Sequence, residues 1–284
     1  MNYLRAAVSF RAGLQPNTTI PRIERSLPPA VMQEQQLETL RRLCHYPSDG
    51  YVPLTYPYIY ALPLHLSNML DSRFPLPIIG TVHIRSHIRQ IRPIGSGEQV
   101  RTVCWIEGHR ETEKGTEFDL CTLLYAGADI VWQGTATMLR RLRRQAKDPA
   151  LPTSAVRPSL DGVGATSEVW RLPKGLSRQF AFASGDLNPI HVSALAARLF
   201  GFSGAIMHGS WAEMRMAGTQ PALCRQPHVE LRCDFKQPIQ LPATIIFRQW
   251  PQRSNSGRVE LRLLNSSATK PHAIGIFGPE ETNS

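Results

Sequence analysis

Alternating hydrophobic and polar residues fill two long stretches of the chain. In the first stretch, four segments alternate or are rich in β-branched and aromatic residues, which predicts antiparallel strands at residues 82–91, 98–111, 116–127 and 129–142. In the second stretch, the same pattern predicts strands at residues 228–239, 243–252, 258–266 and 272–277. Asn255-Ser256-Gly257 is typical of a hairpin turn between two of these strands.

A segment compatible with a helix precedes each set of strands. In the second half, residues 206–218 offer an apolar face that includes Met207 and Met214. In the first half, the equivalent segment covers residues 57–71 and is interrupted by Pro63. A helix followed by a run of antiparallel strands, twice over, predicts an α+β arrangement in which each sheet wraps around a helix.

The two halves also match each other at a constant spacing. His83 aligns with His228, and Pro93 aligns with Pro238. In both places a Pro-Ile pair ends an alternating segment and another strand pattern follows. This similarity indicates the duplication of a β-rich unit.

A stretch rich in proline, serine and glycine separates the halves. We therefore predict an N-terminal unit at residues 1–146, a linker at 147–166 and a C-terminal unit at 167–284. Residues 1–30 and the tail 279–284 are expected to be loosely attached.

The chain has 284 residues, of which 42% are hydrophobic, and a net charge of +10. No apolar run approaches the roughly 20 residues that span a bilayer, so no membrane segment is expected. The densest basic run ends the first half, but it has no nucleic-acid motif and no interleaved aromatic residues, so no nucleic-acid partner is expected. A basic surface also suits coenzyme A or an acidic carrier protein, and the run could equally be a solvated strand end.

Five cysteines are scattered along the chain, and no two form a C-x-x-C pair. This pattern argues against a disulfide framework and a zinc site, and it favours a reducing compartment. We therefore predict a cytoplasmic location. The first acidic residue is Glu24, so a basic mitochondrial presequence is the minor alternative.

The passage from Gln179 to Trp211 holds the candidate chemistry. Gly185-Asp186 predicts a turn, and Asn188-Pro189 predicts a helix start with asparagine as the cap. A short helix over residues 191–200 would then follow. Asp186 and His191 lie across this junction, so a carboxylate and an imidazole can converge on one water molecule as an acid–base pair.

His208-Gly209 opens the next predicted helix. Glycine allows a ligand to approach the backbone closely, and a helix N-terminus offers free N–H groups and a positive dipole end. Such a position suits a developing enolate oxygen. Each of these residues also has a structural reading: Asn188 as a cap, and His208 as a backbone hydrogen-bond partner at a helix entry.

The combination F-x-x-x-S-G-D-x-N-P-I-H, A-x-x-x-G-F and I-x-H-G, which begins at Phe180, resembles the signature of the MaoC-like dehydratases. These are also called the (R)-specific enoyl-CoA hydratase or hydratase 2 family. Residues 52–85 are similar to the N-terminal unit of two-hotdog bacterial 3-hydroxyacyl-thioester dehydratases. The resemblance implies a double hotdog fold, in which two antiparallel sheets each wrap a central helix and join into one extended sheet.

Carried over by position, the resemblance makes Asp186 and His191 the catalytic, water-activating pair. It assigns contacts with the substrate to Ser184, Asn188, His208 and Gly209, the last through its backbone N–H. Two positions depart from the family pattern, because this chain has Ser193 two residues after His191 and Ala205 before the I-x-H-G element. Neither position performs chemistry, so the departures bear on loop shape and substrate range.

The first half lacks the signature. It contains His65, His83 and His87, but no carboxylate at the corresponding spacing. We interpret it as a degenerate unit that widens the groove for an acyl tail, lined by residues such as Tyr56, Tyr58, Ile59 and Leu62.

The resemblance implies a hydro-lyase that interconverts a trans-2-enoyl thioester and an (R)-3-hydroxyacyl thioester. The carrier would be coenzyme A or the phosphopantetheine of an acyl carrier protein, with no metal or other cofactor. A homodimer is possible. An acyl thioesterase and a non-catalytic module that binds acyl thioesters remain the alternatives.

Overall fold

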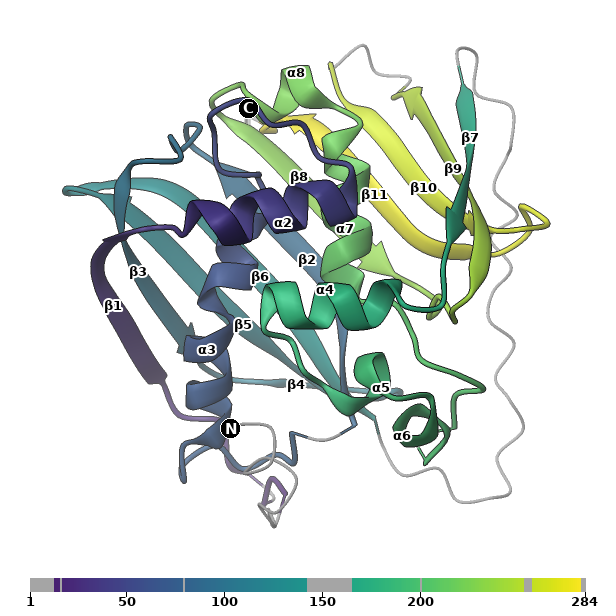
Figure 1. Ribbon diagram of the computed structural model, residues 1–284. Coiled ribbons are helices and arrows are strands. Elements are labelled where there is room, and N and C mark those ends of the chain that lie inside the picture. The colour runs from purple at the N-terminus through teal and green to yellow at the C-terminus, as the bar shows by residue number, and fades with distance from the viewer. Residues whose placement is uncertain are drawn as a thin grey trace.

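The computed structural model describes residues 13–15, 17–78, 80–141, 165–199, 201–252 and 257–281. Nearly all of the predicted linker and two residues of the predicted Asn255-Ser256-Gly257 turn lie outside these residues. Within them, eleven strands form a single sheet (Figure 1). Among the described residues, no helix combines the length and apolar character needed to cross a bilayer.

All eight predicted strands are present. The strands of the first half are β1 (Ile23–Val31), β2 (Thr81–Gln90), β3 (Gln99–Ile106), β4 (Arg110–Thr112), β5 (Gly115–Ala126) and β6 (Asp129–Arg141). Those of the second half are β7 (Thr166–Leu172), β8 (Val229–Phe235), β9 (Ala243–Pro251), β10 (Val259–Asn265) and β11 (Pro271–Pro279). The order across the sheet is β1-β3-β5-β6-β2-β8-β11-β10-β9-β7, with β4 paired to β5.

This order repeats one topology twice, outward from the β2–β8 seam. Arg85 pairs with Asp234 at one end of the seam and Gln90 pairs with Val229 at the other. The two strands that match in the sequence therefore lie side by side at equivalent places. The topology supports the predicted duplication. The boundaries of the two units, at residues 146 and 167, stay a prediction.

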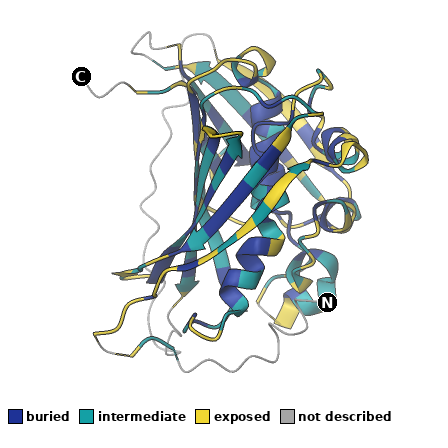
Figure 2. Cartoon of the chain, turned by 90° about the vertical axis from the view of Figure 1, so that its left-hand side faces the viewer, coloured by how far each residue is buried: buried dark blue, intermediate teal, exposed yellow. Residues whose placement is uncertain are grey.

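The helices lie on one face of the sheet (Figure 1). They are α2 (Glu34–Cys44), α3 (Tyr56–Leu70), α4 (Leu176–Ser184), α5 (Pro189–Val192), α6 (Ala194–Leu199), α7 (Gly209–Gly218) and α8 (Pro221–Cys224). Helix α3 packs against β1, β3 and β5, and α7 packs against β8, β10 and β11. Seen from the side, buried residues run through the sheet and the helices that cover it (Figure 2).

Two expectations about the first half were wrong. The chain before residue 30 is not loosely attached over its described part, because β1 pairs with β3 and the side chains of Ile20 and Ile23 are buried. Its Pro28-Pro29 pair falls at a register shift of this edge strand, where proline is tolerated. Helix α3 also continues through Pro63, whose side chain is exposed.

The C-terminal tail is also attached along its described part. Strand β11 extends to Pro279, and Glu280 accepts a hydrogen bond from Arg89 of β2 at 2.8 Å. The tail is therefore fixed to the seam between the halves rather than loose.

Candidate active site

The turn between α4 and α5 positions Asp186. Gly185 ends α4 with φ of 78°, and its N–H bonds the Ala181 carbonyl at 2.9 Å. A left-handed residue at this position suits glycine, as the sequence predicts. The Asp186 N–H then donates to Ser184 Oγ at 3.2 Å, so Ser184 fixes the turn and does not line the active cavity.

Asn188 caps the next helix as predicted. Its Oδ1 accepts a hydrogen bond from the Ile190 N–H at 3.4 Å, and its own N–H donates to Asp186 Oδ1 at 3.3 Å. The helix predicted over residues 191–200 is divided instead, because Ser193 adopts an extended conformation between α5 and α6. Ser193 Oγ then accepts from the Ala196 N–H at 3.3 Å, so this departure from the family pattern caps a new helix.

The imidazole of His191 is held in one protonation form. Its Nδ1 lies 2.8 Å from the Ile206 carbonyl, which can only accept, so Nδ1 carries the proton. The other nitrogen, Nε2, is thereby left with a lone pair that can accept a proton. Burial lowers the pKa of His191, and the Asp186 charge and the Ile206 carbonyl offset part of that effect. The ring is therefore neutral near pH 7 and able to act as a base.

His208 stacks on His191 with ring centroids 3.7 Å apart. Its Nε2–H donates to the Asp186 backbone carbonyl at 3.1 Å and lies 3.9 Å from Asp186 Oδ2. Burial, together with His191, lowers the pKa of His208 to about 3. His208 is therefore a neutral hydrogen-bond donor that ties the Asp186 turn to the start of α7, and the sequence signals only its place before that helix.

The side chains of Asp186, His191 and His208 converge. One ligand-type atom from each lies within 4.8 Å of the others, and within the described ranges this is the one such group that could hold a metal ion. The same separation accommodates a water molecule between a carboxylate and an imidazole. That the site works without a metal stays a prediction.

Gly209 is the first residue of α7. Its N–H has no acceptor among the described residues, as expected for the first turn of a helix. A Cβ placed on Gly209 would lie 3.2 Å from the ring of Phe235. Only glycine therefore leaves both the Phe235 contact and the free N–H undisturbed.

A cavity of about 430 Å³ contains these groups, and both halves of the chain line it. Asp186, Asn188, His191, His208 and Gly209 form one side of it. The lining also includes Tyr58, His83 and Met138 of the first half.

Of the four residues predicted to line the first half of the groove, the cavity includes Tyr58 alone. Tyr56 and Ile59 are buried in the core, and Leu62 packs against it. Among the histidines of that half, His83 faces the cavity, whereas His65 bonds Thr122 at 2.8 Å and His87 bonds Glu230 across the seam at 2.9 Å. The sequence contains no local signal for the place of His83.

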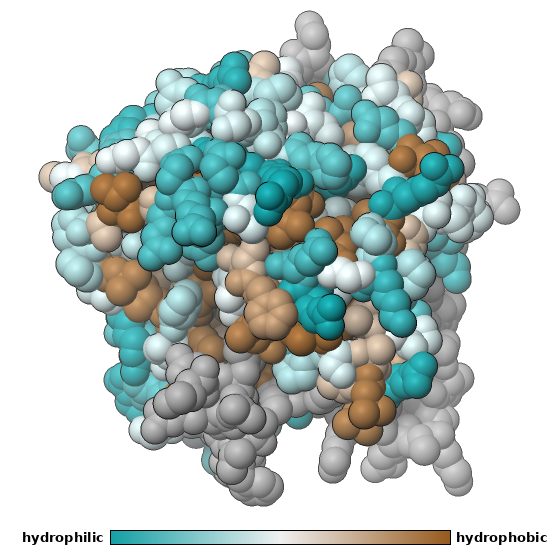
Figure 3. Space-filling model, viewed as in Figure 1, coloured by the Kyte–Doolittle hydropathy of each residue, from teal (hydrophilic) through white to brown (hydrophobic). Residues whose placement is uncertain are grey.

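Apolar side chains also reach the surface around the segment that carries the site. Phe182 of α4 and Leu195 and Leu199 of α6 are 67%, 71% and 82% exposed. Figure 3 shows brown, apolar atoms on the face where α4 and α6 lie in front. These exposed apolar residues lie on α4 and α6, which flank the short helix α5 that carries His191.

Comparison with known proteins assigns the family. The model of the MaoC like domain matches residues 165–267. The 3-hydroxyacyl-thioester dehydratase X of Mycobacterium tuberculosis is 32% identical over 249 residues, which cover 86% of this chain and 85% of that protein. The chain belongs to the MaoC-like dehydratase family.

Solved structures share the fold of the chain. The crystal structure of HtdX from M. tuberculosis aligns with a TM-score of 0.75 and 26% identity over 90% of this chain and 100% of that chain. A MaoC-like dehydratase from Phytophthora capsici aligns with a TM-score of 0.70 and 17% identity over 93% of this chain and 96% of that chain. The α+β double hotdog fold predicted from the sequence is confirmed.

Proposed function

We propose that this MaoC-like dehydratase adds water to a trans-2-enoyl thioester and, in reverse, removes water from an (R)-3-hydroxyacyl thioester, with Asp186 and His191 as the catalytic pair. One observation carries the proposal: a neutral imidazole with a free Nε2 lies beside a carboxylate in a cavity of about 430 Å³. Membership of the dehydratase family supports the reaction class.

The geometry suggests how the two protons are handled. A water molecule between Asp186 and His191 Nε2 gives one proton to this pair while its oxygen bonds to C3 of the enoyl group. The pair returns a proton to C2, so H and OH add from the same side and the protein ends in its starting state. Dehydration follows the same steps in reverse.

Negative charge on the thioester oxygen rises as C3 is attacked. The free Gly209 N–H at the positive end of α7 can donate a hydrogen bond to that oxygen. His208 is a positioning residue here, because its hydrogen bond holds the Asp186 backbone.

Replacing Gly209 by alanine tests this assignment. The added methyl group would lie 3.2 Å from the ring of Phe235, so either that ring or the start of α7 would have to move by a few tenths of an ångström. We expect a loss in kcat on the order of 10²-fold, the size seen when one oxyanion donor is displaced. The measurement is steady-state turnover, and Gly97→Ala serves as the matched control because no atom lies within 4 Å of a Cβ at that exposed turn. Unchanged turnover in Gly209→Ala would remove the N–H from the proposal.

The proposal extends to the acyl chain, the thiol carrier, the cellular location and the oligomeric state. Tyr58, His83 and Met138 form the wall that an acyl tail would contact, and the carrier is coenzyme A or an acyl carrier protein. We propose that no metal takes part, that the protein acts in the cytoplasm, and that it forms a homodimer. Activity that survives extensive treatment with EDTA would support the metal-free reaction.

The reaction itself is tested with crotonyl thioesters. Hydration removes the absorbance of the conjugated enoyl group and releases no thiol, and we expect this result with the full chain. Release of free thiol without prior hydration would indicate a thioesterase, and binding without turnover would indicate a non-catalytic module. Either result would contradict the proposed reaction.

A further inference from the structure

Strand β2 of the first half contributes an unusual part of the active cavity. Residues 81–84 all line it, although neighbours along a regular strand face opposite sides of the sheet. The pairing of β2 with β6 shifts register between His83 and Arg85. Irregularities of this kind re-aim side chains beside active sites. Consecutive residues of β2 therefore reach one cavity, and His83 is among them.

The imidazole of His83 is fixed in one protonation form. Its Nε2 lies 2.8 Å from the Arg85 carbonyl, which can only accept, so Nε2 carries the proton. The ring lies between those of Tyr58 and Phe235, with centroid separations of 5.3 and 4.8 Å. Burial lowers the pKa of His83 to about 4, so the ring is neutral near pH 7. Nδ1 therefore keeps a lone pair that can accept a hydrogen bond.

This lone pair has no partner within the described part of the chain. No donor there bonds His83 Nδ1, and the atom is not sealed from solvent. His65 differs, because its unpartnered Nδ1 is fully enclosed. A ligand in the cavity can therefore reach the acceptor atom of His83.

The hydroxyl of Tyr58 provides a donor beside this acceptor. Tyr58 of α3 also lines the cavity, and its hydroxyl is neither hydrogen-bonded to a described residue nor sealed from solvent. Burial, together with the charges of Asp186 and Glu213, raises the pKa of Tyr58, so the hydroxyl stays protonated. A donor next to an acceptor suits a single hydroxyl group, which can donate one hydrogen bond and accept another.

Phe235 connects these two groups to the reacting part of the site. Its ring lies 3.2 Å from a Cβ placed on Gly209, and its centroid lies 4.8 Å from that of His83. The charge of Asp186 also affects the pKa values of His83 and Tyr58, as expected for neighbouring groups. An acyl chain that starts at the Gly209 N–H can therefore reach His83 a few carbons beyond C3.

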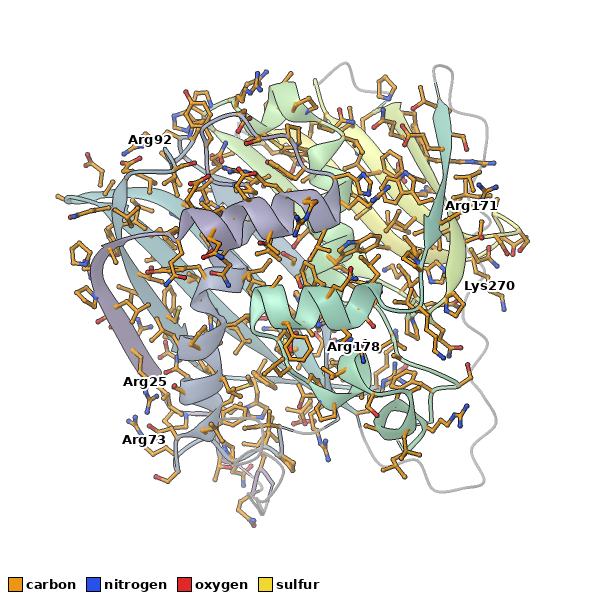
Figure 4. All side chains as sticks on the ribbon, viewed as in Figure 1. Arg25, Arg73, Arg92, Arg171, Arg178 and Lys270 are labelled. Atoms are coloured by element: carbon orange, nitrogen blue, oxygen red, sulfur yellow. The ribbon has the colours of Figure 1, made fainter. Side chains whose placement is uncertain are left out.

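A plain alkyl chain does not satisfy this pair. It would displace water from His83 Nδ1 and from the Tyr58 hydroxyl without replacing the hydrogen bonds, which weakens binding. A keto or carboxylate group has no proton to donate to Nδ1. Figure 4 shows the exposed side chains of Arg92 and Arg171 at opposite edges of the molecule, whereas His83 and Tyr58 are uncharged groups inside the cavity. A neutral hydroxyl fits both of them.

We propose that the cavity selects 2-enoyl thioesters whose acyl chain carries a hydroxyl group beyond C4, which donates to His83 Nδ1 and accepts from the Tyr58 hydroxyl. The inference rests on the proposed function, because the thioester at Gly209 sets the position of the chain. His83 and Tyr58 are then specificity residues that touch the substrate. The first half supplies the selectivity, and the second half supplies the reaction.

The test compares trans-2-octenoyl-CoA with derivatives that carry a hydroxyl group at C5, C6 or C7, and with the keto counterpart of the preferred alcohol. For the full chain, we expect at least one alcohol to exceed the plain and keto thioesters in kcat/KM by about tenfold to hundredfold. His83→Phe keeps a ring between Tyr58 and Phe235 but removes the acceptor, so it should lower this ratio by about tenfold or more. Tyr58→Phe removes only the hydroxyl and should lower the ratio by about threefold to tenfold.

The ratio between two substrates of one variant does not depend on how much of that variant is folded. His228→Phe and Tyr125→Phe make the same changes at residues that do not line the cavity, and they should keep the wild-type ratio. A wild type that prefers none of the three alcohols would overturn the inference. So would a preference that persists in His83→Phe.

Saturated analogues separate this inference from the proposed reaction. Octanoyl-CoA and its hydroxylated derivatives cannot be hydrated, and calorimetry should show tighter binding of an alcohol by the wild type but not by His83→Phe. If no enoyl thioester is hydrated while an alcohol binds more tightly, the reaction is wrong and the selectivity stands. If plain and hydroxylated enoyl thioesters are hydrated equally well, the reaction stands and the selectivity fails.

Discussion

Asp186→Asn should lower kcat for crotonyl-thioester hydration by a factor on the order of 10²–10⁴, the range that positioned acid–base groups contribute. The amide keeps the shape of the side chain and can still accept from the Asn188 N–H at 3.3 Å. It cannot share a proton with the reacting water. His191→Gln should cause a similar loss, because the free Nε2 lone pair disappears while an amide can still reach the Ile206 carbonyl.

The controls for these variants use the same chemical changes elsewhere. Asp129 and His228 are exposed and lie outside the active cavity, so Asp129→Asn and His228→Gln should retain wild-type turnover. Thermal unfolding of all four variants would show whether a loss of rate reflects a loss of folded protein. Full turnover by Asp186→Asn would remove the carboxylate from the mechanism.

The part of the site that could be predicted from the sequence depends on short-range contacts. The Gly185 turn, the Asn188 cap and the placing of Asp186 against His191 are all decided within a few residues, by hydrogen bonds that those residue types favour. Turn and cap residues can be predicted from the sequence because each makes its hydrogen bonds to backbone groups only a few residues away.

The part of the cavity lining that comes from the first half could not be predicted in this way. His83 reaches the site because β2 pairs with β8, which is far away in the sequence. Alternation specifies that β2 is a strand but does not specify its neighbour. Tyr58 likewise depends on how α3 packs against the sheet, so the neighbouring tyrosine, Tyr56, was predicted to line the groove and lies in the core instead.

Three of the elements that the sequence analysis missed, β1, β7 and α2, show two different causes. The outermost strands β1 and β7 are mostly exposed, so their sequences lack a clear apolar alternation. Helix α2, by contrast, buries Leu37, Leu40 and Cys44, which follow helical spacing. This helical spacing is present in the sequence, although no helix was predicted there.

Acid should destabilise the fold well above the pH at which carboxylates titrate. His65, His191 and His208 are buried and neutral, and burial lowers the pKa of His65 and of His208 to about 3 and lowers that of His191 as well. In the unfolded chain these rings titrate near pH 6.5. Below that pH the unfolded state binds more protons, so the stability that is present above pH 6.5 is lost as the pH falls, by about 1.4 kcal/mol per ring and pH unit.

One buried carboxyl opposes this trend. Burial raises the pKa of Glu213 to about 7, so its contribution to stability grows as the pH falls from 7 toward 4.5. Against this one carboxyl, His65 and His208 leave a net loss of roughly 1.4 kcal/mol per pH unit between about pH 6 and 5, and His191 and His83, whose pKa values are lowered as well, increase that loss. Urea unfolding at pH 7.5, 6 and 5 measures the slope. His65→Gln, whose amide can still bond Thr122, should reduce the slope by about 1.4 kcal/mol per pH unit, since one ring that stays neutral in the folded state is removed. A free energy of unfolding that is constant from pH 7 to 5 would show that these rings are not held neutral by burial.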